Sequence, residues 1–158
     1  MRRTFVEELF KIIENDKNVV VLLGDLGYGI FDEIREKFPE QCLNVGASEQ
    51  LMLGMSVGIA LQGKIPICYS ITPFMLYRPF EFIRNYMQEE KIPVKLVGSG
   101  RGKDYLDAGF THFSEEAEPI LEALPNIKAY FPKENIELKS IINEFVYSVS
   151  PAFLSLRK

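Results

Sequence analysis

One carboxylate precedes a long uncharged stretch of the sequence. Glu49 stands directly before residues 50–63, which contain no charged residue. Small residues recur within this stretch, namely Gly54, Ser56, Gly58 and Ala60. At the start of an apolar helix, burial favours the neutral carboxyl and the positive end of the helix favours the carboxylate, so Glu49 could hold or share a proton. A plain role as a partner of the helix N-terminus is the alternative that position alone favours.

Aromatic residues are concentrated in residues 70–82, where they surround Arg78. They are Phe74, Tyr77, Phe80 and Phe82. Their faces could stack on a flat heterocycle, or their rings could fill the space between a helix and a sheet. Phe80, Ile83 and Met87 have the spacing of an ordinary buried helix face, which favours the second interpretation.

His112 is the only histidine, and it ends a glycine-rich, charged loop over residues 99–113. A position after a strand indicates an exposed side chain that could hydrogen-bond a substrate or transfer a proton. The alternative is a surface or capping histidine. A lone histidine with scattered partners predicts no metal site in the chain.

The elements that must position these residues alternate along the chain. Helical spacing of apolar residues predicts helices over residues 3–16, 30–38, 48–62, 79–90, 114–123 and 133–149. Apolar runs predict strands in 19–29, 42–45, 65–71, 94–98, 127–131 and 152–156. Such alternation predicts an α/β fold with an open, mainly parallel sheet and helices on both faces.

Composition narrows the function classes. The length of 158 residues and 47% hydrophobic content predict one domain over residues 1–158. A net charge of -4 with scattered Lys and Arg argues against nucleic acid as a partner. No apolar run reaches the roughly 20 residues of a membrane-spanning helix, and the N-terminus lacks a signal-peptide pattern. Cys42 and Cys68 lie in apolar runs, which indicates buried thiols and a cytoplasmic location.

Several phosphate-binding and nucleophile motifs are absent. The sequence contains no GxxxxGK[ST], no GxGxxG after its first strand and no GxSxG. Gly24, Gly27 and Gly29 are too loosely spaced to form a phosphate cradle, and no cluster of metal ligands is seen. If the chain is part of an enzyme, phosphate and metal must be bound elsewhere.

The motifs occur in an order that resembles a known family. They are residues 21–27 (VLLGDLG), 38–39 (FP), 44–50 (NVGASEQ), the small residues of 54–63, Phe74, 78–85, 109–112 (GFTH) and 125–127 (PNI) with Pro132. Together they resemble the pyrimidine-binding domain of transketolase and of deoxyxylulose-phosphate synthase, over about residues 4–156. Residues 44–50, followed by the small-residue helix, are the most specific part.

This resemblance implies roles for individual residues. The glutamate matching Glu49 hydrogen-bonds the pyrimidine ring of thiamine diphosphate and favours the tautomer that removes the thiazolium proton. Phe74 and Phe80, with Tyr77 as a further candidate, match aromatics that stack on the pyrimidine. His112 matches a histidine that faces the donor substrate and is expected to be catalytic with Glu49. Asp25 and Gly27 are expected where the substrate channel opens.

The resemblance also implies that the diphosphate-binding half of the active site lies on another subunit. Family enzymes bind the diphosphate and Mg²⁺ on a separate domain with a GDG motif, and neither that domain nor the transketolase C-terminal domain is recognisable here. We therefore expect a split enzyme, inactive alone, whose GDG-bearing partner subunit binds Mg²⁺ and shares the cofactor. The helix around Gly54–Ala60 offers a surface for close packing, and two such heterodimers would form a heterotetramer.

The expected reaction is transfer of a two-carbon ketol unit between sugar or sugar-phosphate substrates. A thiamine-diphosphate-dependent 2-oxo acid decarboxylase, dehydrogenase or synthase subunit is the alternative with related chemistry. An alternative of another class is a non-catalytic scaffold that only holds an oligomer together. Retention of Glu49 within its motif argues against the scaffold.

Overall fold

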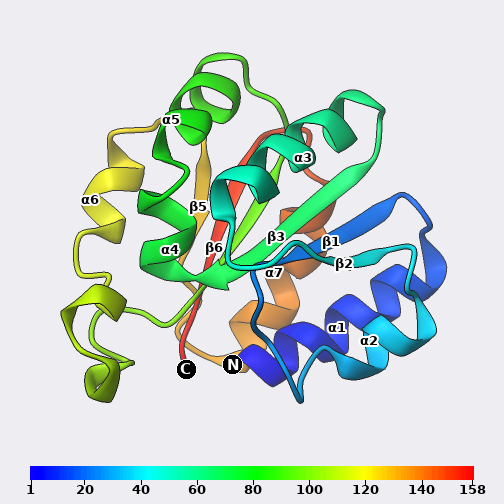
Figure 1. The fold of residues 1–158 in the computed structure, drawn as a ribbon, viewed down its shortest axis with the longest axis horizontal. Coiled ribbons are helices and arrows are strands. Elements are labelled where there is room, and N and C mark those ends of the chain that lie inside the picture. Colours follow the sequence, from blue (N-terminus) through cyan, green and yellow to red (C-terminus); the bar gives the residue numbers. More distant parts are fainter.

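The computed structural model describes residues 1–158 and contains one six-stranded parallel sheet. The strands are β1 (Val19–Leu23), β2 (Cys42–Asn44), β3 (Ile65–Ile71), β4 (Lys95–Ser99), β5 (Lys128–Tyr130) and β6 (Ala152–Leu156). Their order is β2-β1-β3-β4-β6-β5, and every neighbouring pair is parallel (Figure 1). The predicted α/β class is confirmed.

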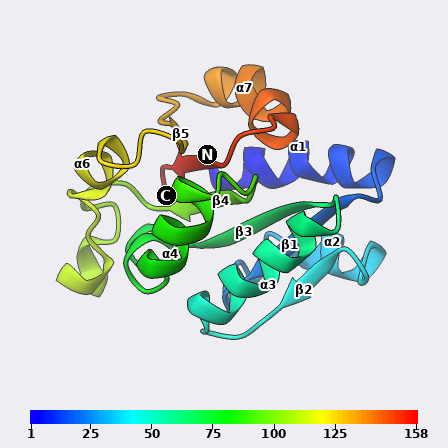
Figure 2. The same ribbon diagram turned by 90° about the horizontal axis from the view of Figure 1, so that it is seen from above.

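Helices cover both faces of this sheet (Figure 2). On one face lie α1 (Arg2–Asn15), α2 (Asp32–Lys37) and α7 (Asn135–Tyr147). On the other lie α3 (Glu49–Leu61), α4 (Thr72–Tyr77), the short α5 (Phe80–Phe82) and α6 (Ala117–Glu122). Side chains of β1 alternate between the two cores, with Val19 and Val21 in one and Val20 and Leu22 in the other.

Two local features bear on the sequence-based expectations. Cys42 and Cys68 are both buried and free, which confirms them as buried thiols, and burial raises the pKa of Cys42 to about 11 and that of Cys68 to about 12. No helix combines the length and the apolar character needed to cross a bilayer.

One helix was not predicted, and another is less regular than predicted. α4 begins at Thr72, with Pro73 in its first turn, whereas the sequence placed a helix start only at Pro79. Residues 79–90 form α5 and then a π-helical segment, Ile83–Glu89. α4 is only six residues long, too short for helical spacing to be recognised within an aromatic-rich segment.

α3 contains no charged residue after Glu49, yet in the single chain it is buried on one side only. Leu51 is 57% exposed and Leu61 is 68% exposed, and Gly58 between them is also exposed. Met52, Leu53 and Val57 face the core instead. The uncharged composition of α3 suits a helix that is covered on both sides. Within this chain, however, only its inner side has a surface to pack against.

The candidate site residues lie at the edge of the sheet where the chain crosses from one side of β1 to the other. The chain passes from β1 to β2 on one side and then crosses to β3 on the other side of β1. The amide of Gly24, just after β1, donates to the carbonyl of Tyr69 in β3 (3.1 Å). α3 makes the crossover and packs on β3 and β1, so its first residue, Glu49, reaches this edge. A crevice at such a reversal point is the usual binding position in open α/β sheets.

A glycine in β4 permits α4 to approach the sheet. A Cβ atom on Gly98 would lie 2.6 Å from the Phe153 ring, 2.6 Å from the Thr72 hydroxyl and 3.2 Å from the Thr72 Cα. Both neighbours are fully buried, so neither has space to move away. Gly98 therefore sets the position of the helix that carries the first aromatic of the candidate site.

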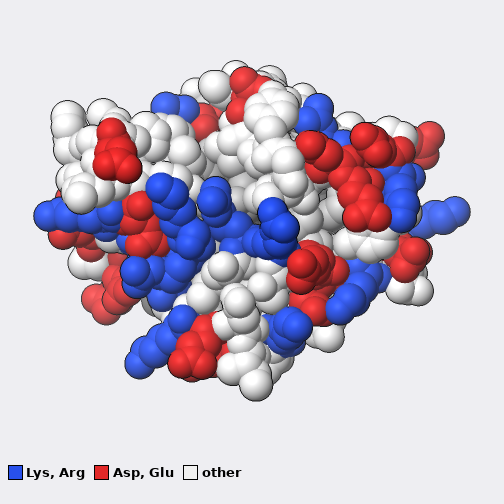
Figure 3. All heavy atoms as spheres, turned by 90° about the horizontal axis from the view of Figure 1, so that it is seen from below, with Lys and Arg blue, Asp and Glu red and all other residues white.

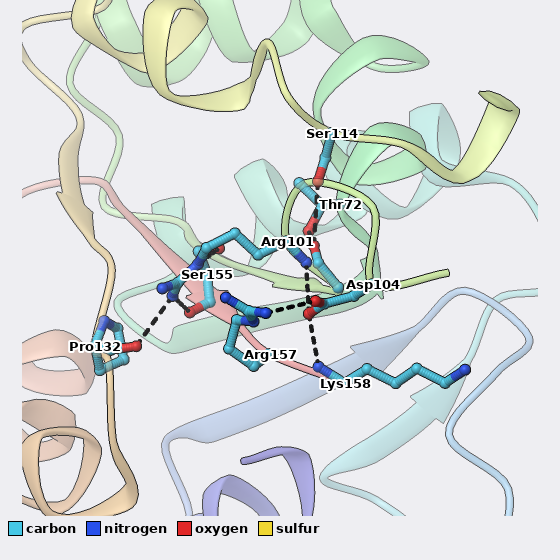
Figure 4. Close-up of polar contacts among 9 residues, drawn as sticks. Thr72, Arg101, Asp104, Ser114, Pro132, Ser155, Arg157 and Lys158 are labelled. Atoms are coloured by element: carbon cyan, nitrogen blue, oxygen red, sulfur yellow. Dashed lines mark hydrogen bonds and ion pairs between the residues drawn. The ribbon is translucent and has the colours of Figure 1, made fainter. Parts of the chain in front are cut away.

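The loop that carries His112 is fixed at its base (Figure 4). The carbonyl of Gly100 accepts hydrogen bonds from the hydroxyls of Thr72 (2.5 Å) and Ser114 (3.3 Å), and the Ser114 amide donates to Gly102 (2.9 Å). Both ends of the loop are thereby held against the start of α4.

Charged groups fix the same loop to the end of the chain. Arg101 donates to the carbonyls of Ser155 (2.7 Å) and Pro132 (3.2 Å), while Asp104 pairs with Arg157 (3.0 Å) (Figure 4). Asp104 also accepts from the amide of Lys158, and these donors hold its pKa below the usual range despite the opposing effect of burial. The loop is long but well anchored.

Replacing Gly98 tests the close approach of α4. Gly98→Ala should lower the free energy of unfolding by about 1–3 kcal/mol, because the added methyl overlaps two buried neighbours. Gly58→Ala is the matched control: a Cβ there meets no atom within 4 Å, so replacing this helical glycine should stabilise by roughly 0.5–1 kcal/mol. Denaturant unfolding measures both, and equal effects of the two changes would contradict the packing argument.

Replacing Thr72 tests the anchoring of the loop. Thr72→Val keeps the shape but removes a donor to Gly100, which should cost about 1 kcal/mol. Amide hydrogen exchange at His112 and Phe113 should become faster. Ser140→Ala removes a comparable hydroxyl-to-carbonyl bond on the exposed side of α7 and should leave these two amides unchanged. Unaltered exchange in Thr72→Val would show that the loop is held by other contacts.

Candidate active site

Glu49 is a buried carboxylate with partners on two other elements. Its side chain is 1% exposed. Oε1 accepts from the hydroxyl of Ser70 on β3 (3.0 Å), and Oε2 accepts from Nη1 of Arg78 (2.8 Å). The carboxyl thus bonds to β3 and to the residue after α4, and the N-terminus of α3 has no side-chain cap hydrogen bond. As an acidic residue in the first turn of α3, Glu49 is still placed to interact with the positive end of the helix.

Arg78, Phe74 and His112 continue the cluster away from the carboxyl. The guanidinium carbon of Arg78 lies 3.8 Å from the centroid of the Phe74 ring, a stacking distance. His112 meets Phe74 edge-on, with 4.9 Å between ring centroids, and its Nδ1 lies 3.1 Å from the Thr111 hydroxyl. Tyr105 packs on His112 as well, at 6.1 Å. The structure therefore brings together Glu49, Phe74 and His112, three of the residues expected from the sequence.

Tyr77 and Phe80 lie outside this contact chain. The hydroxyl of Tyr77 donates to Glu116 at the start of α6 (3.2 Å), and burial together with the nearby carboxylate raises the pKa of Tyr77 to about 12. Tyr77 lines a hollow of about 600 Å³ with Phe110, Phe113 and other residues that flank His112. Phe80 is 38% exposed on α5 and has no ring contact with Phe74 or His112.

Asp25 and Gly27 shape the loop after β1. The amide of Asp25 donates to Oδ1 of Asn44 (3.0 Å), and Nδ2 of Asn44 donates back to the Asp25 carboxyl (3.1 Å). Hydrogen bonds from Tyr28 and then from Asn44 lower the pKa of Asp25. Gly27 has φ +85°, and a Cβ there would lie 2.7 Å from the Phe31 ring, so only glycine fits. The pair Asp25–Asn44 fixes the turn that leads to Glu49.

The surrounding surface carries unevenly distributed charge. Figure 3 shows the face toward which the strands run, and Lys and Arg gather on its left side, where the C-terminus and the 100–113 loop lie in Figure 1. These segments contain Arg101, Lys103, Arg157 and Lys158. No group of three or more His, Cys, Asp or Glu side chains is close enough to hold a metal ion.

Sequence reasoning gave no role to three residues of the site. Ser70 and Arg78 hold the two oxygens of Glu49, and Gly24 leaves space beside them, because a Cβ there would lie 3.3 Å from the Ser70 hydroxyl and 3.5 Å from Oε1. The available signals were a polar residue at the end of a buried strand and a single arginine among aromatics. Neither signal identifies its partner, because the pairing depends on the crossover of α3.

The arrangement can present a carboxyl group to a flat heterocycle. The buried Ser70 holds Oε1, whereas Oε2 faces the half-exposed side chain of Arg78. That second oxygen can accept a hydrogen bond from a ring or, when protonated, donate one to a ring nitrogen. The ring of Phe74 lies within reach of the same space, as its stacking with Arg78 shows.

Known proteins similar to this chain share this region. A family model described as the transketolase pyrimidine-binding domain matches residues 1–158. A "putative transketolase C-terminal section" from Methanocaldococcus jannaschii is 31% identical over 157 residues, which are 99% of this chain and 50% of that protein. The "6-deoxy-6-sulfo-D-fructose transketolase subunit SqwH" of a Clostridium species is 27% identical over 99% of this chain and 49% of its own length.

A solved structure with the same fold is also similar in sequence. It is described as a split-gene transketolase in an inactive beta4 tetramer, with a TM-score of 0.85 and 26% identity over 99% of this chain and 50% of that one. This chain spans about half the length of these relatives. Because the family model covers the whole sequence, the chain belongs to the transketolase pyrimidine-binding domain family.

Proposed function

We propose that this chain is the pyrimidine-binding part of a split, thiamine-diphosphate-dependent transferase of the transketolase kind. It would take part in moving a two-carbon ketol unit between sugar or sugar-phosphate substrates. The observation that carries the proposal is the buried carboxyl of Glu49 at the reversal point of the sheet, in a chain that the family model covers throughout. Relatives named as transketolase subunits support the reaction class.

The residues present fit the pyrimidine end of the cofactor. Glu49 offers a carboxyl oxygen that is shielded from water, and Phe74 offers an aromatic face next to it. Gly24 leaves space beside that carboxyl that a larger residue would fill. The diphosphate and its Mg²⁺ are assigned in this proposal to the partner subunit.

Each residue has a proposed task. When bound, thiamine diphosphate supplies the carbanion-stabilising chemistry of the reaction. Glu49 holds a proton at Oε2 against the pyrimidine ring, while Ser70 keeps Oε1 in place. Phe74 stacks on the ring, with Tyr77 and Phe80 as further aromatics of the same segment. His112, fixed against Phe74, hydrogen-bonds the donor substrate and acts as a catalytic acid or base.

The substrate reaches this site past the loop after β1. Asp25 and Gly27 border its opening in this proposal, and Asp25 is exposed there. Basic residues on the same face favour phosphorylated substrates over neutral sugars. A 2-oxo acid decarboxylase or dehydrogenase would require the same use of Glu49, so the transketolase reaction rests on the named relatives.

The remaining half of the active site would come from a partner subunit. That subunit carries the GDG motif and binds the diphosphate and Mg²⁺, and the cofactor is shared between the two chains. The exposed apolar side of α3, with Leu51, Gly58 and Leu61, provides a surface for close subunit contact. Two heterodimers would then form a heterotetramer in the cytoplasm, where two free, buried thiols remain reduced.

The role of Glu49 is tested by replacing its carboxyl group with an amide. Glu49→Gln should lower the rate of ketol transfer by at least about a hundredfold, because the amide cannot hold or share a proton at Oε2. Glu122→Gln, an exposed glutamate on α6, should leave the rate unchanged. The rate is measured with the partner subunit, thiamine diphosphate and Mg²⁺. Full activity of Glu49→Gln would eliminate the proposed role and favour the scaffold.

The shared cofactor is tested by binding measurements on separate and mixed subunits. This chain alone should show no micromolar affinity for thiamine diphosphate, because the proposal assigns the diphosphate and Mg²⁺ to the partner subunit. Addition of the partner should produce micromolar binding that depends on Mg²⁺. Isothermal titration calorimetry distinguishes the two cases. Tight binding by the isolated chain would refute a cofactor held across an interface.

A further inference from the structure

Arg78 already makes both contacts that the proposed cofactor would need. Its Nη1 donates to Oε2 of Glu49 at 2.8 Å, and its guanidinium lies 3.8 Å from the centroid of the Phe74 ring. One flat cation therefore engages both the ring of Phe74 and the carboxyl oxygen that Ser70 does not use. The Arg78 side chain makes no other hydrogen bond or ion pair in the chain.

We propose that Arg78 occupies the place of the aminopyrimidine and must be displaced when the cofactor binds. The inference rests on the proposed function. A guanidinium and an aminopyrimidine are both planar, both present nitrogen atoms at their edge, and both stack on aromatic rings. A single carboxyl oxygen and a single ring cannot hold both groups in the same position. The ion pair is therefore a self-blocking contact of the free chain.

The geometry lets Arg78 leave without moving the backbone. Arg78 lies between α4 and α5 with ordinary helical angles, φ -64° and ψ -47°, and Pro79 follows it. Its side chain is 47% exposed, whereas that of Glu49 is 1% exposed. Rotation about side-chain bonds would carry the guanidinium into solvent, while Glu49 is held by its burial and by Ser70.

Displacement of Arg78 would also change which hydrogen bonds Glu49 can make. In the ion pair Glu49 acts as a carboxylate, which accepts hydrogen bonds and has no proton to donate. A buried carboxylate without its cation is costly, so Arg78 has little tendency to leave before another group arrives. Departure of the arginine and arrival of the ring are therefore one coupled exchange, and Oε2 of Glu49 becomes available to the ring only in the loaded site.

The experiment measures binding of the neutral probe 4-amino-2,5-dimethylpyrimidine to the full chain by NMR titration. Arg78→Met should bind the probe about tenfold more tightly than the wild type, because no ion pair has to be broken. Arg78→Lys keeps the charge but loses the flat group that stacks on Phe74, and its affinity should fall between the two. Arg84→Met is the control: this exposed arginine contacts Asn85, and its loss should not alter binding.

Glu49→Gln separates this inference from the proposed function. Equal binding of the probe by wild type and Glu49→Gln, or no binding by any variant, would remove the basis of both. Loss of binding in Glu49→Gln without a gain in Arg78→Met or Arg78→Lys would overturn only the self-blocking contact and make Arg78 a support of the site. If thermal melting shows that Arg78→Met does not fold, Arg78→Lys decides, since it leaves the buried carboxylate with a cation.

A structure of the loaded complex gives an independent answer. With partner subunit, thiamine diphosphate and Mg²⁺ bound, Arg78 should have lost its hydrogen bond to Oε2 of Glu49. A guanidinium that still donates to Glu49 and stacks on Phe74 in that complex would contradict the exchange. This readout requires no turnover and is therefore independent of the substrate.

Discussion

Burial of one carboxyl group between three chain segments is the constraint on which the rest of the structure depends. Glu49 starts α3, Ser70 lies in β3 and Arg78 follows α4, so a single side chain connects the crossover helix, the sheet and the aromatic segment. A carboxylate that is 1% exposed must have its hydrogen bonds satisfied, because a buried, unpaired charge is far too costly. In the free chain, Ser70 and Arg78 supply these hydrogen bonds.

Close approach of backbones makes this arrangement possible. Gly98 lets the first turn of α4 contact β4, and Gly24 leaves the space next to Oε1 of Glu49. Both positions lack the positive φ that usually explains a glycine, so their reason is packing alone. The base of the 100–113 loop is fixed to the same first turn through Thr72, which connects His112 to α4 as well. A small shift of α4 would thus disturb the aromatic side chains, the arginine and the histidine together.

The chain packs its own core but leaves several large apolar side chains exposed. The inner side of α3 packs on the sheet, whereas Leu51 and Leu61 face outward. Phe110 is 82% exposed in the loop that carries His112. Exposed apolar groups on both sides of the candidate site are consistent with a site completed by another surface. The contact of Arg78 with Glu49 gives this open half-site a stable state of its own.

The sequence by itself determined the fold class and singled out Glu49 as a candidate. Apolar runs and helical spacing depend on local periodicity, which is why the strands and most helices were predicted with small errors at their ends. The motif at residues 44–50 identified Glu49, and the loop position identified His112, because both signals are local. The six-residue α4 was missed since it is shorter than the window over which periodicity can be recognised.

Only the tertiary structure decided what these residues contact. Ser70 is 21 positions from Glu49 and Arg78 is 29 positions from it, and neither separation has any local pattern. Their meeting depends on the sheet order, in which the crossover by α3 places β3 beside β1. The same order placed Phe74 at the site and directed Tyr77 toward α6 instead. A carboxylate whose position suggested a helix cap became half of an ion pair, because burial required a partner that only the folded chain could supply.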